Sequence, residues 1–421
     1  MADDGRPGGA GGPFRALRHR NFAIFWTGAV LSNIGSWLSN LTVPYVLYQL
    51  TGSALWTGVA SLAQFGPHIL LTPVAGMVAD RCDRRAVLLS TQTGMAVTAI
   101  AMWWLWGSNA DSPYSPYLLL VLVSLMGALQ GINLPSWQAF VNDLLPREDL
   151  ASGITLNSLQ YNAPRAIGPA IAGVTLATLG ATWAFLFNAL SFGTVIIALL
   201  LIQWKRTARP ARSSPRTGFF VAFRYLAGQP GISVSIALAF AAGVLANPIL
   251  NFTVVFAESV FMVGAVALGL LTAAYGIGSV IAAPYLASSR RVSHAIVARQ
   301  GLLFCGVGLT LFALAPNIVV GGIGLVFLGG GFLAVMVSTN TSLQMIVAPH
   351  IRGRVIAVRI MLYSSSFPLG ALVQTALSDV VGPRPVVLTA GILLLGITVA
   401  FGLGPGWQLL RRLDDPPDLE G

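Results

Sequence analysis

The sequence predicts an all-α integral membrane protein with twelve transmembrane helices in two six-helix halves. Three observations lead to this prediction: the composition is very apolar, long apolar runs alternate with short connections, and basic residues cluster in every second connection. Apolar residues make up 55% of the chain and charged residues only 9%, against about 45–50% and about 25% in soluble domains. So few charges do not cover a body of 421 residues with polar surface, and lipid must be its solvent.

The net charge of +10 does not predict nucleic-acid binding, because the basic residues stand in short clusters rather than along one continuous face. Basic loops beside the negatively charged inner leaflet explain the excess better. Cys82 and Cys305 show no metal-ligand spacing, so we expect no disulfide, no metal and no cofactor. The first twenty residues lack the apolar stretch of a cleavable signal peptide.

The transmembrane helices are predicted from run length. A bilayer core of about 30 Å requires about 20 apolar residues per helix, and twelve such runs follow one another with short connections, so that consecutive helices are antiparallel neighbours. The first six runs cover residues 22–50, 54–78, 86–107, 117–140, 150–179 and 181–204, and the second six cover 231–255, 265–287, 296–314, 318–347, 354–380 and 386–410.

The arginines orient these helices. One side of the predicted bundle carries basic clusters at 15–20, 81–85, 147, 205–216, 290–291, 352–354 and 411–412, whereas the other carries Arg384 beside the acidic residues Asp111 and Glu258. Because cytoplasmic connections are enriched in Arg and Lys, we expect both termini and the central loop in the cytoplasm. The protein is therefore expected to be a multi-pass protein of a bacterial inner membrane, monomeric and surrounded by membrane lipids.

The chain divides at a basic loop that contains Pro210 and Pro215. The expected parts are an N-terminal tail (1–20), a six-helix half (21–204), a central loop (205–230), a second half (231–410) and a C-terminal tail (411–421). Residues 219–228 are expected to form an amphipathic helix on the inner leaflet. A faint repeat relates the halves, and such a plan is typical of transporters with a substrate site between the halves near the midplane.

The sharpest motif follows the second run and spans Gly76 to Arg85. Gly76 allows a neighbouring helix to approach closely, and Asp80 is placed to accept hydrogen bonds from the N-terminus of another helix. The eleventh helix begins near Arg352 and Arg354, which are suitable partners. Asp143 is expected to pair with Arg81 or Arg84. Alternatively, the arginines, Arg85 included, only retain the loop on the inner side.

This segment resembles the loop 2–3 signature of the major facilitator superfamily, glycine-x-x-x-aspartate-arginine-x-x-arginine-arginine. Further matches resemble the group of macrolide-efflux proteins and the enterobactin exporter. They lie at 17–22, at 33–37, at 156–158, at Arg165, at Gly168-Pro169-Ala170 with Gly173, and at 352–355. The resemblance implies the major facilitator fold and a latch at the cytoplasmic gate. The helix 5 glycines and proline look like part of the motif associated with antiporters, although Pro164 replaces a glycine and the closing double glycine is absent.

Arg165 is the most costly residue in the chain, because it lies close to the bilayer midplane, where an arginine costs at least about 2.5–3.5 kcal/mol. Acidic residues near the runs all lie toward helix ends, so we expect a positively charged cavity that suits an anionic or neutral amphiphile. Alternatively, Arg165 bonds amides such as Asn162 or Gln130 for structural reasons. Other cavity candidates are Asn33, Ser36, Gln64, Gln130, Asn133, Asn162, Asn247, Asn251, Asn340 and Tyr363. Arg359, near a helix end, either joins them or extends to the cytoplasmic interface.

These residues favour a proton-coupled exporter of a small amphiphile such as a siderophore, a macrolide-like drug or a lysolipid. An importer or facilitator of a small metabolite is the alternative. An intramembrane lipid-processing enzyme is disfavoured because no nucleophile, metal or nucleotide motif is visible, so we expect no catalytic residue. The exporter would act on a small-molecule substrate and use the proton gradient. The candidates for proton coupling are Asp80, Asp143, Glu258, Asp379 and His68.

Overall fold

The computed structural model describes residues 14–110, 112–203, 225–226, 228–288, 293–348 and 351–415. Within these ranges the chain is helical throughout and contains no strand. Most of the expected amphipathic helix at 219–228, of the central loop and of both expected tails lies outside the described residues, as do Asp111 and the arginines at 205–216 and 290–291.

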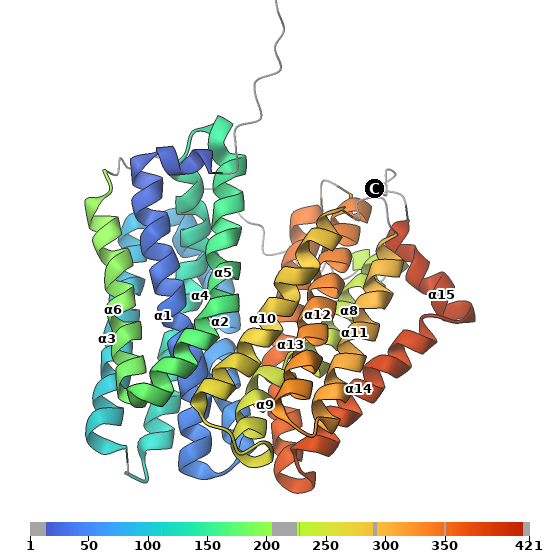
Figure 1. Ribbon diagram of the computed structural model, residues 1–421. Coiled ribbons are helices and arrows are strands. Elements are labelled where there is room, and N and C mark those ends of the chain that lie inside the picture. The colour runs from blue at the N-terminus through green and yellow to red at the C-terminus, as the bar shows by residue number, and fades with distance from the viewer. Residues whose placement is uncertain are drawn as a thin grey trace, which may run out of the picture.

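The first half consists of six long helices (Figure 1), which match the first six predicted runs to within a few residues. Their described residues form three apolar clusters, two of them toward opposite ends of the bundle and a third between α3, α4 and α6. A short 3-10 turn, η1 (Arg15–Arg18), precedes them. The six are α1 (Arg20–Thr51), α2 (Ala54–Arg81), α3 (Arg84–Asn109), α4 (Ser115–Asp143), α5 (Leu150–Thr178) and α6 (Gly180–Leu201).

The second half repeats this plan with one broken helix. Its core joins nearly all of its helices in one apolar cluster. The helices are α8 (Pro230–Leu245), α9 (Ile249–Val255) with a π-helical turn η3 (Phe256–Val260), α10 (Ala265–Ser288), α11 (His294–Leu314), α12 (Ile318–Ile346), α13 (Arg352–Val381), α14 (Pro383–Ala400) and α15 (Gly404–Arg411).

Two predicted runs differ from the structure. The run 231–255 is interrupted between α8 and α9 at Asn247-Pro248, because proline has no N–H to continue the helical hydrogen bonds. The run 386–410 is wrong at its end: α14 stops at Ala400, and α15 begins at Gly404, whose φ of +46° suits glycine. Apolar content alone does not reveal either break.

Nine helical segments of the described chain are long and apolar enough to cross a membrane, or ten when α2, bent by 56°, counts as one span. The pair α8–α9 counts among the nine as one segment, Pro230–Val260. The two remaining long helices are α1 and α5, with 32 and 29 residues. Both are long enough to span the bilayer, and both carry polar side chains that line the cavities described below. The described chain therefore contains the twelve predicted spans in two halves of six, and one span is broken at α8–α9.

The two halves touch at one end and diverge toward the other (Figure 1). Helix α5 packs against α10, and α2 packs against α13. The diverging end carries η1, the α2–α3 connection and α15, and is called the basic end below; the closed end carries Glu258 and Asp379 and is called the acidic end. The backbones of the two halves approach closely at Gly173 of α5, where a Cβ would lie 2.7 Å from Gly269 Cα of α10.

Candidate functional site

Two cavities carry the site residues. One of about 880 Å³ lies between the two halves and is called the larger cavity below; the other has about 260 Å³ and is called the smaller cavity. Helix α5 forms one wall of the larger cavity, and α10, α12 and α13 of the other half form the rest. Because Phe14, beside η1, also lines it, the cavity reaches the basic end. Its polar and charged lining includes Ser158, Asn162, Arg165, Ser279, Asn340, Thr341, Arg359 and Tyr363. Within the described part of the chain, no carboxylate lines it.

Arg165 of α5 reaches across to the second half. Its Nη2 donates a hydrogen bond to the hydroxyl of Tyr275 on α10 at 3.4 Å, and its guanidinium lies 5.3 Å from the centre of the Tyr275 ring. A cation over an aromatic face is stabilised by the ring quadrupole. Its buried Nε has no partner among the described residues. Asn162 instead donates to the Ser158 carbonyl, and among the described residues Arg165 bonds the Tyr275 hydroxyl rather than the amides of Asn162 or Gln130.

Aromatic rings continue from this contact through the second half. The Tyr275 ring lies 6.2 Å from Phe332 on α12, and Phe332 lies 6.5 Å from Tyr363 on α13, centre to centre. Tyr363 stands one turn after Arg359, so both side chains share one face of α13. The cavity therefore combines two cations, one from each half, with a row of aromatic rings.

Arg359 is buried, with 7% of its surface exposed, and does not extend to the interface. Its Nη2 donates to the carbonyl of Met336 and to Thr339 Oγ1 of α12, both at 3.3 Å, and its Nε has no partner. Within the part of the chain that the structure describes, neither Arg359 nor Arg165 forms an ion pair. A buried cation, Arg359, and a partly buried one, Arg165, thus line one cavity without a counter-charge among the described residues.

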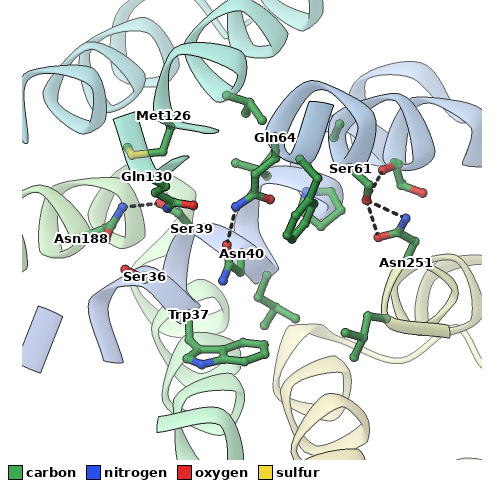
Figure 2. A pocket seen from close by; sticks show the side chains of 18 of the residues that line it. Ser36, Trp37, Ser39, Asn40, Ser61, Gln64, Met126, Gln130, Asn188 and Asn251 are labelled. Carbon is green, nitrogen blue, oxygen red and sulfur yellow. Dashed lines mark hydrogen bonds between the residues drawn. The ribbon is translucent and has the colours of Figure 1, made fainter. Parts of the chain in front are cut away.

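The smaller cavity, of about 260 Å³, lies mainly within the first half, near its contact with the second (Figure 2). Its lining is uncharged. Gln64 bonds Asn40 at 3.2 Å, and Asn188 donates to Ser39 at 2.7 Å. Figure 2 also shows Asn251 of α9, which donates to Ser61 of α2 at 2.9 Å and so links the halves. The remaining lining includes Ser36, Trp37, Phe65, Met126, Gln130, Phe192 and Phe367.

The cavity candidates therefore separate into three groups. Asn162, Arg165, Asn340 and Tyr363 line the larger cavity, and Ser36, Gln64, Gln130 and Asn251 line the smaller one. Asn33, Asn133 and Asn247 line neither: Asn33 bonds the carbonyl of Ala29, Asn133 donates to Thr91 of α3 at 2.7 Å, and Asn247 is buried at the α8–α9 break.

Sequence reasoning missed Tyr275, Asn40 and Asn188. Tyr275 lies in an apolar run, and its hydroxyl becomes noteworthy only because Arg165 of the other half reaches it. Asn40 and Asn188 carried a signal, since amides within apolar runs are costly unless they bond.

The acidic end is closed by contacts between the halves. The Asp379 carboxylate of α13 accepts hydrogen bonds from the Ser53 hydroxyl and from the backbone N–H groups of Ala54 at 2.7 Å and Leu55 at 3.2 Å. These groups form the N-terminus of α2, where a negative charge is favourable. Nearby, Gln49 of α1 donates to Glu258 of η3 at 2.7 Å. Asp379 and Glu258 thus join the halves at this end.

The basic-end arginines make their described contacts within their own half of the protein, not across the two halves. Arg84 pairs with Asp143 of α4, one of the two pairings expected. Arg85 donates to the Leu200 carbonyl at 3.2 Å, and Arg352 donates to the Val347 carbonyl at 3.1 Å. Arg81 and Arg354 are exposed.

The expected contacts of Gly76 and Asp80 are absent in this conformation. No heavy atom of the described chain lies within 4 Å of a Cβ placed on Gly76, and Asp80 is exposed. The physical reason is the divergence of the halves at the basic end, which separates the α2 C-terminus from the α13 N-terminus (Figure 1).

The helix 5 residues lie where the halves meet. Gly168 faces Trp37 of α1, and a Cβ there would lie 2.7 Å from the Trp37 Cβ. Gly173 and Gly269 bring α5 and α10 into backbone contact, and the carbonyl of Pro169 lies beside Gly269. His68 is partly buried on α2, 6.5 Å from the Phe65 ring. No cluster of metal-ligating side chains occurs among the described residues.

Comparisons with known proteins agree with this architecture. Residues 11–404 match the model of a family described as transmembrane secretion effectors. The staphyloferrin A transporter of Staphylococcus aureus is 26% identical and covers 90% of this chain and 94% of its own. The multidrug efflux pump Tap of Mycolicibacterium fortuitum is 25% identical, covering 92% and 95%, and the enterobactin exporter EntS of Salmonella typhi is 25% identical, covering 95% of each.

Among solved structures, a bacterial homolog of the human lysosomal transporter Spinster superposes with a TM-score of 0.74 over 97% of this chain and 99% of its own at 15% identity. A bacterial homologue of the iron transporter ferroportin gives a TM-score of 0.67 at 17% identity, covering 90% and 98%. Because the family model matches most of the chain, the protein belongs to the transmembrane secretion effector family of the major facilitator superfamily, whose members are transporters and not enzymes.

Proposed function

We propose that this transporter exports a small amphiphilic anion from the cytoplasm by alternating access. The observation that carries the proposal is the larger cavity, which lies between the halves and presents Arg165 without a lining carboxylate. An arginine at membrane depth requires a partner or a ligand, and the aromatic rings of Phe332 and Tyr363 in the same cavity suit an apolar body. The relatives named for staphyloferrin A, enterobactin and drug efflux are consistent with such a substrate.

The proposed orientation places the basic end in the cytoplasm, since arginine-rich connections face inward. In that orientation the cavity is open to the cytoplasm and closed by Asp379 and Glu258 on the outside. Outward opening would separate these contacts and bring the Asp80 region against the α13 N-terminus. This rocking of two rigid halves is typical of transporters built from repeats.

Proton coupling is the second element of the proposal. Asp379 of one half caps α2 of the other, so a proton on this carboxylate would weaken a contact that holds one conformation. Glu258 contacts Gln49 of the other half and would act in the same way. A proton on Asp143 would weaken its pair with Arg84 at the basic end of the first half. We place the coupling at these gate carboxylates and the transport cycle in a monomer, because one chain contains both halves and the whole cavity.

The experiment compares metabolites in the medium and in cells that express wild type or an equally expressed Arg165→Ala variant. Export predicts an acidic compound enriched outside only with wild type. Everted membrane vesicles then test the coupling, because a protonophore should abolish accumulation of that compound. Depletion from the medium with accumulation in wild-type cells would instead support the alternative, an importer or facilitator.

A further inference from the structure

Arg359, the second arginine of the larger cavity, adds a buried positive charge from the half of the protein opposite Arg165. Arg359 belongs to the other half of the transporter, is 7% exposed, and has a buried Nε without a partner among the described residues. Its two hydrogen bonds go to uncharged oxygens on α12. Burying a charge without a counter-charge is costly, so its place in the cavity wall indicates a ligand that supplies the missing charge.

We propose that Arg165 and Arg359 form a two-point anion site that takes a substrate with two acidic groups, one for each half. The inference rests on the proposed function of the cavity and names the substrate class. A planar guanidinium matches a carboxylate with two parallel hydrogen bonds, and each arginine offers a donor edge with an unused Nε–H. The rings of Phe332 and Tyr363 line the same cavity and provide an apolar surface for the body of the substrate, while the buried ring of Tyr275 packs behind Phe332.

The two arginines also make closure of the basic end depend on whether a substrate is bound. Arg165 moves with α5 and Arg359 with α13, so closing the basic end changes the separation of two like charges in a medium of low dielectric constant. In the empty protein this repulsion opposes closure. A dianion that bridges the arginines removes the repulsion and adds an attraction to each half, so the loaded transporter closes more readily. An anion with one acidic group neutralises one arginine and leaves the other uncompensated.

Naphthalene-2,6-dicarboxylate and naphthalene-2-carboxylate are suitable probes, because they share a ring and differ by one acidic group. Binding to the purified full-length protein is measured in lipid nanodiscs by calorimetry. We expect wild type to bind the dicarboxylate more tightly. We also expect Arg359→Gln to weaken dicarboxylate binding about tenfold to a hundredfold, as for loss of one charge-assisted hydrogen-bonded pair, and to leave monocarboxylate binding nearly unchanged. Arg359→Lys should recover part of the loss, because it restores charge without the planar fork.

Arg384→Gln is the matched control. Arg384 also donates to two carbonyls, those of Ala313 and Ala315 at 3.0 Å, but it lies at the acidic end and does not line the larger cavity. Its replacement should leave the affinity for both probes unchanged. Thermal unfolding of each variant shows whether it is folded. If Arg359→Gln is not folded, wild type is compared with Arg359→Lys instead.

Closure is followed by spin labels on the exposed native Cys82 and on an introduced Gln344→Cys, which lie in different halves near the basic end. The other cysteine, Cys305, is buried. The dicarboxylate should shorten the distance between the labels in wild type but not in Arg359→Gln, and the monocarboxylate should have a smaller effect.

Equal affinity of wild type and Arg359→Gln for the dicarboxylate, or no binding of the dicarboxylate to wild type at millimolar concentration, would overturn the two-point site. These experiments distinguish failure of the proposed export function from failure of the two-point site. A cell assay without export, together with arginine-dependent dicarboxylate binding, refutes the proposed function and leaves the site. Arg165-dependent export of a compound with a single acidic group supports export and refutes the pair.

Discussion

Replacing Asp379 with alanine should shift the transporter away from the conformation described here. The Asp379 carboxylate is the acceptor for the Ser53 hydroxyl and for two N–H groups at the start of α2. These bonds join α13 of one half to α2 of the other, and they exist only while the acidic end is closed. Their removal therefore destabilises the closed acidic end and leaves each half internally intact.

The magnitude follows from the kind of bond and its exposure. Charge-assisted hydrogen bonds contribute about 1.5–3 kcal/mol each when buried, and a charge at an exposed helix terminus contributes about 0.3–1 kcal/mol. Asp379 is exposed, so water replaces much of what is lost, and we expect about 1–2 kcal/mol in total. That corresponds to a change of about 5–30-fold in the ratio of the two conformations.

The assay uses the same spin-label pair, Cys82 and Gln344→Cys, in nanodiscs. In Asp379→Ala the shorter-distance population, with the basic end closed, should increase relative to wild type. Asp414→Ala is the control, because Asp414 caps α11 in the same manner, through Ser293 and the N–H of His294 at 2.7 Å, but within one half. A distance distribution in Asp379→Ala identical to wild type would refute the assignment of Asp379 to the gate, as would an equal shift in the control.

Three further outcomes are expected. Arg84→Ala removes the ion pair with Asp143 and should lower the free energy of unfolding by about 1–3 kcal/mol, measured by denaturation in detergent; an unchanged stability would show that the pair is not structural. Gly173→Ala places a Cβ 2.7 Å from the α10 backbone, so it should reduce transport in vesicles at equal expression, whereas Gly193→Ala, which meets nothing within 4 Å, should not; equal activity would contradict the proposed contact. Asn133→Ala breaks a buried hydrogen bond to Thr91 of α3 and should lower the free energy of unfolding by about 1 kcal/mol. It should not change the affinity for the dicarboxylate, and a loss of affinity in calorimetry would show that Asn133 takes part in binding.

Sequence alone determined the parts of this protein that depend on local composition. Apolar runs of bilayer length identified the twelve helices, because each span must satisfy its backbone internally and present apolar side chains to lipid. The same reasoning identified Arg165 as a cavity residue, since a charge at the midplane must face a cavity or a partner. The motif from Gly76 to Arg85 indicated the superfamily that the family match then established.

Tertiary structure decided which residues of different helices meet. Asp379 and Ala54 are 325 positions apart, and a helix N-terminus becomes a partner only after two halves have packed. The same holds for Arg165 with Tyr275, and for Arg359, whose position near a helix end left both burial and exposure open. Hydropathy reports how deep a residue lies in the bilayer, but not its direction around the helix axis or the neighbour it faces. The ends of α8 and α14 were likewise decided by Pro248 and Gly404, whose backbone restrictions act at single positions that an average over an apolar run does not register.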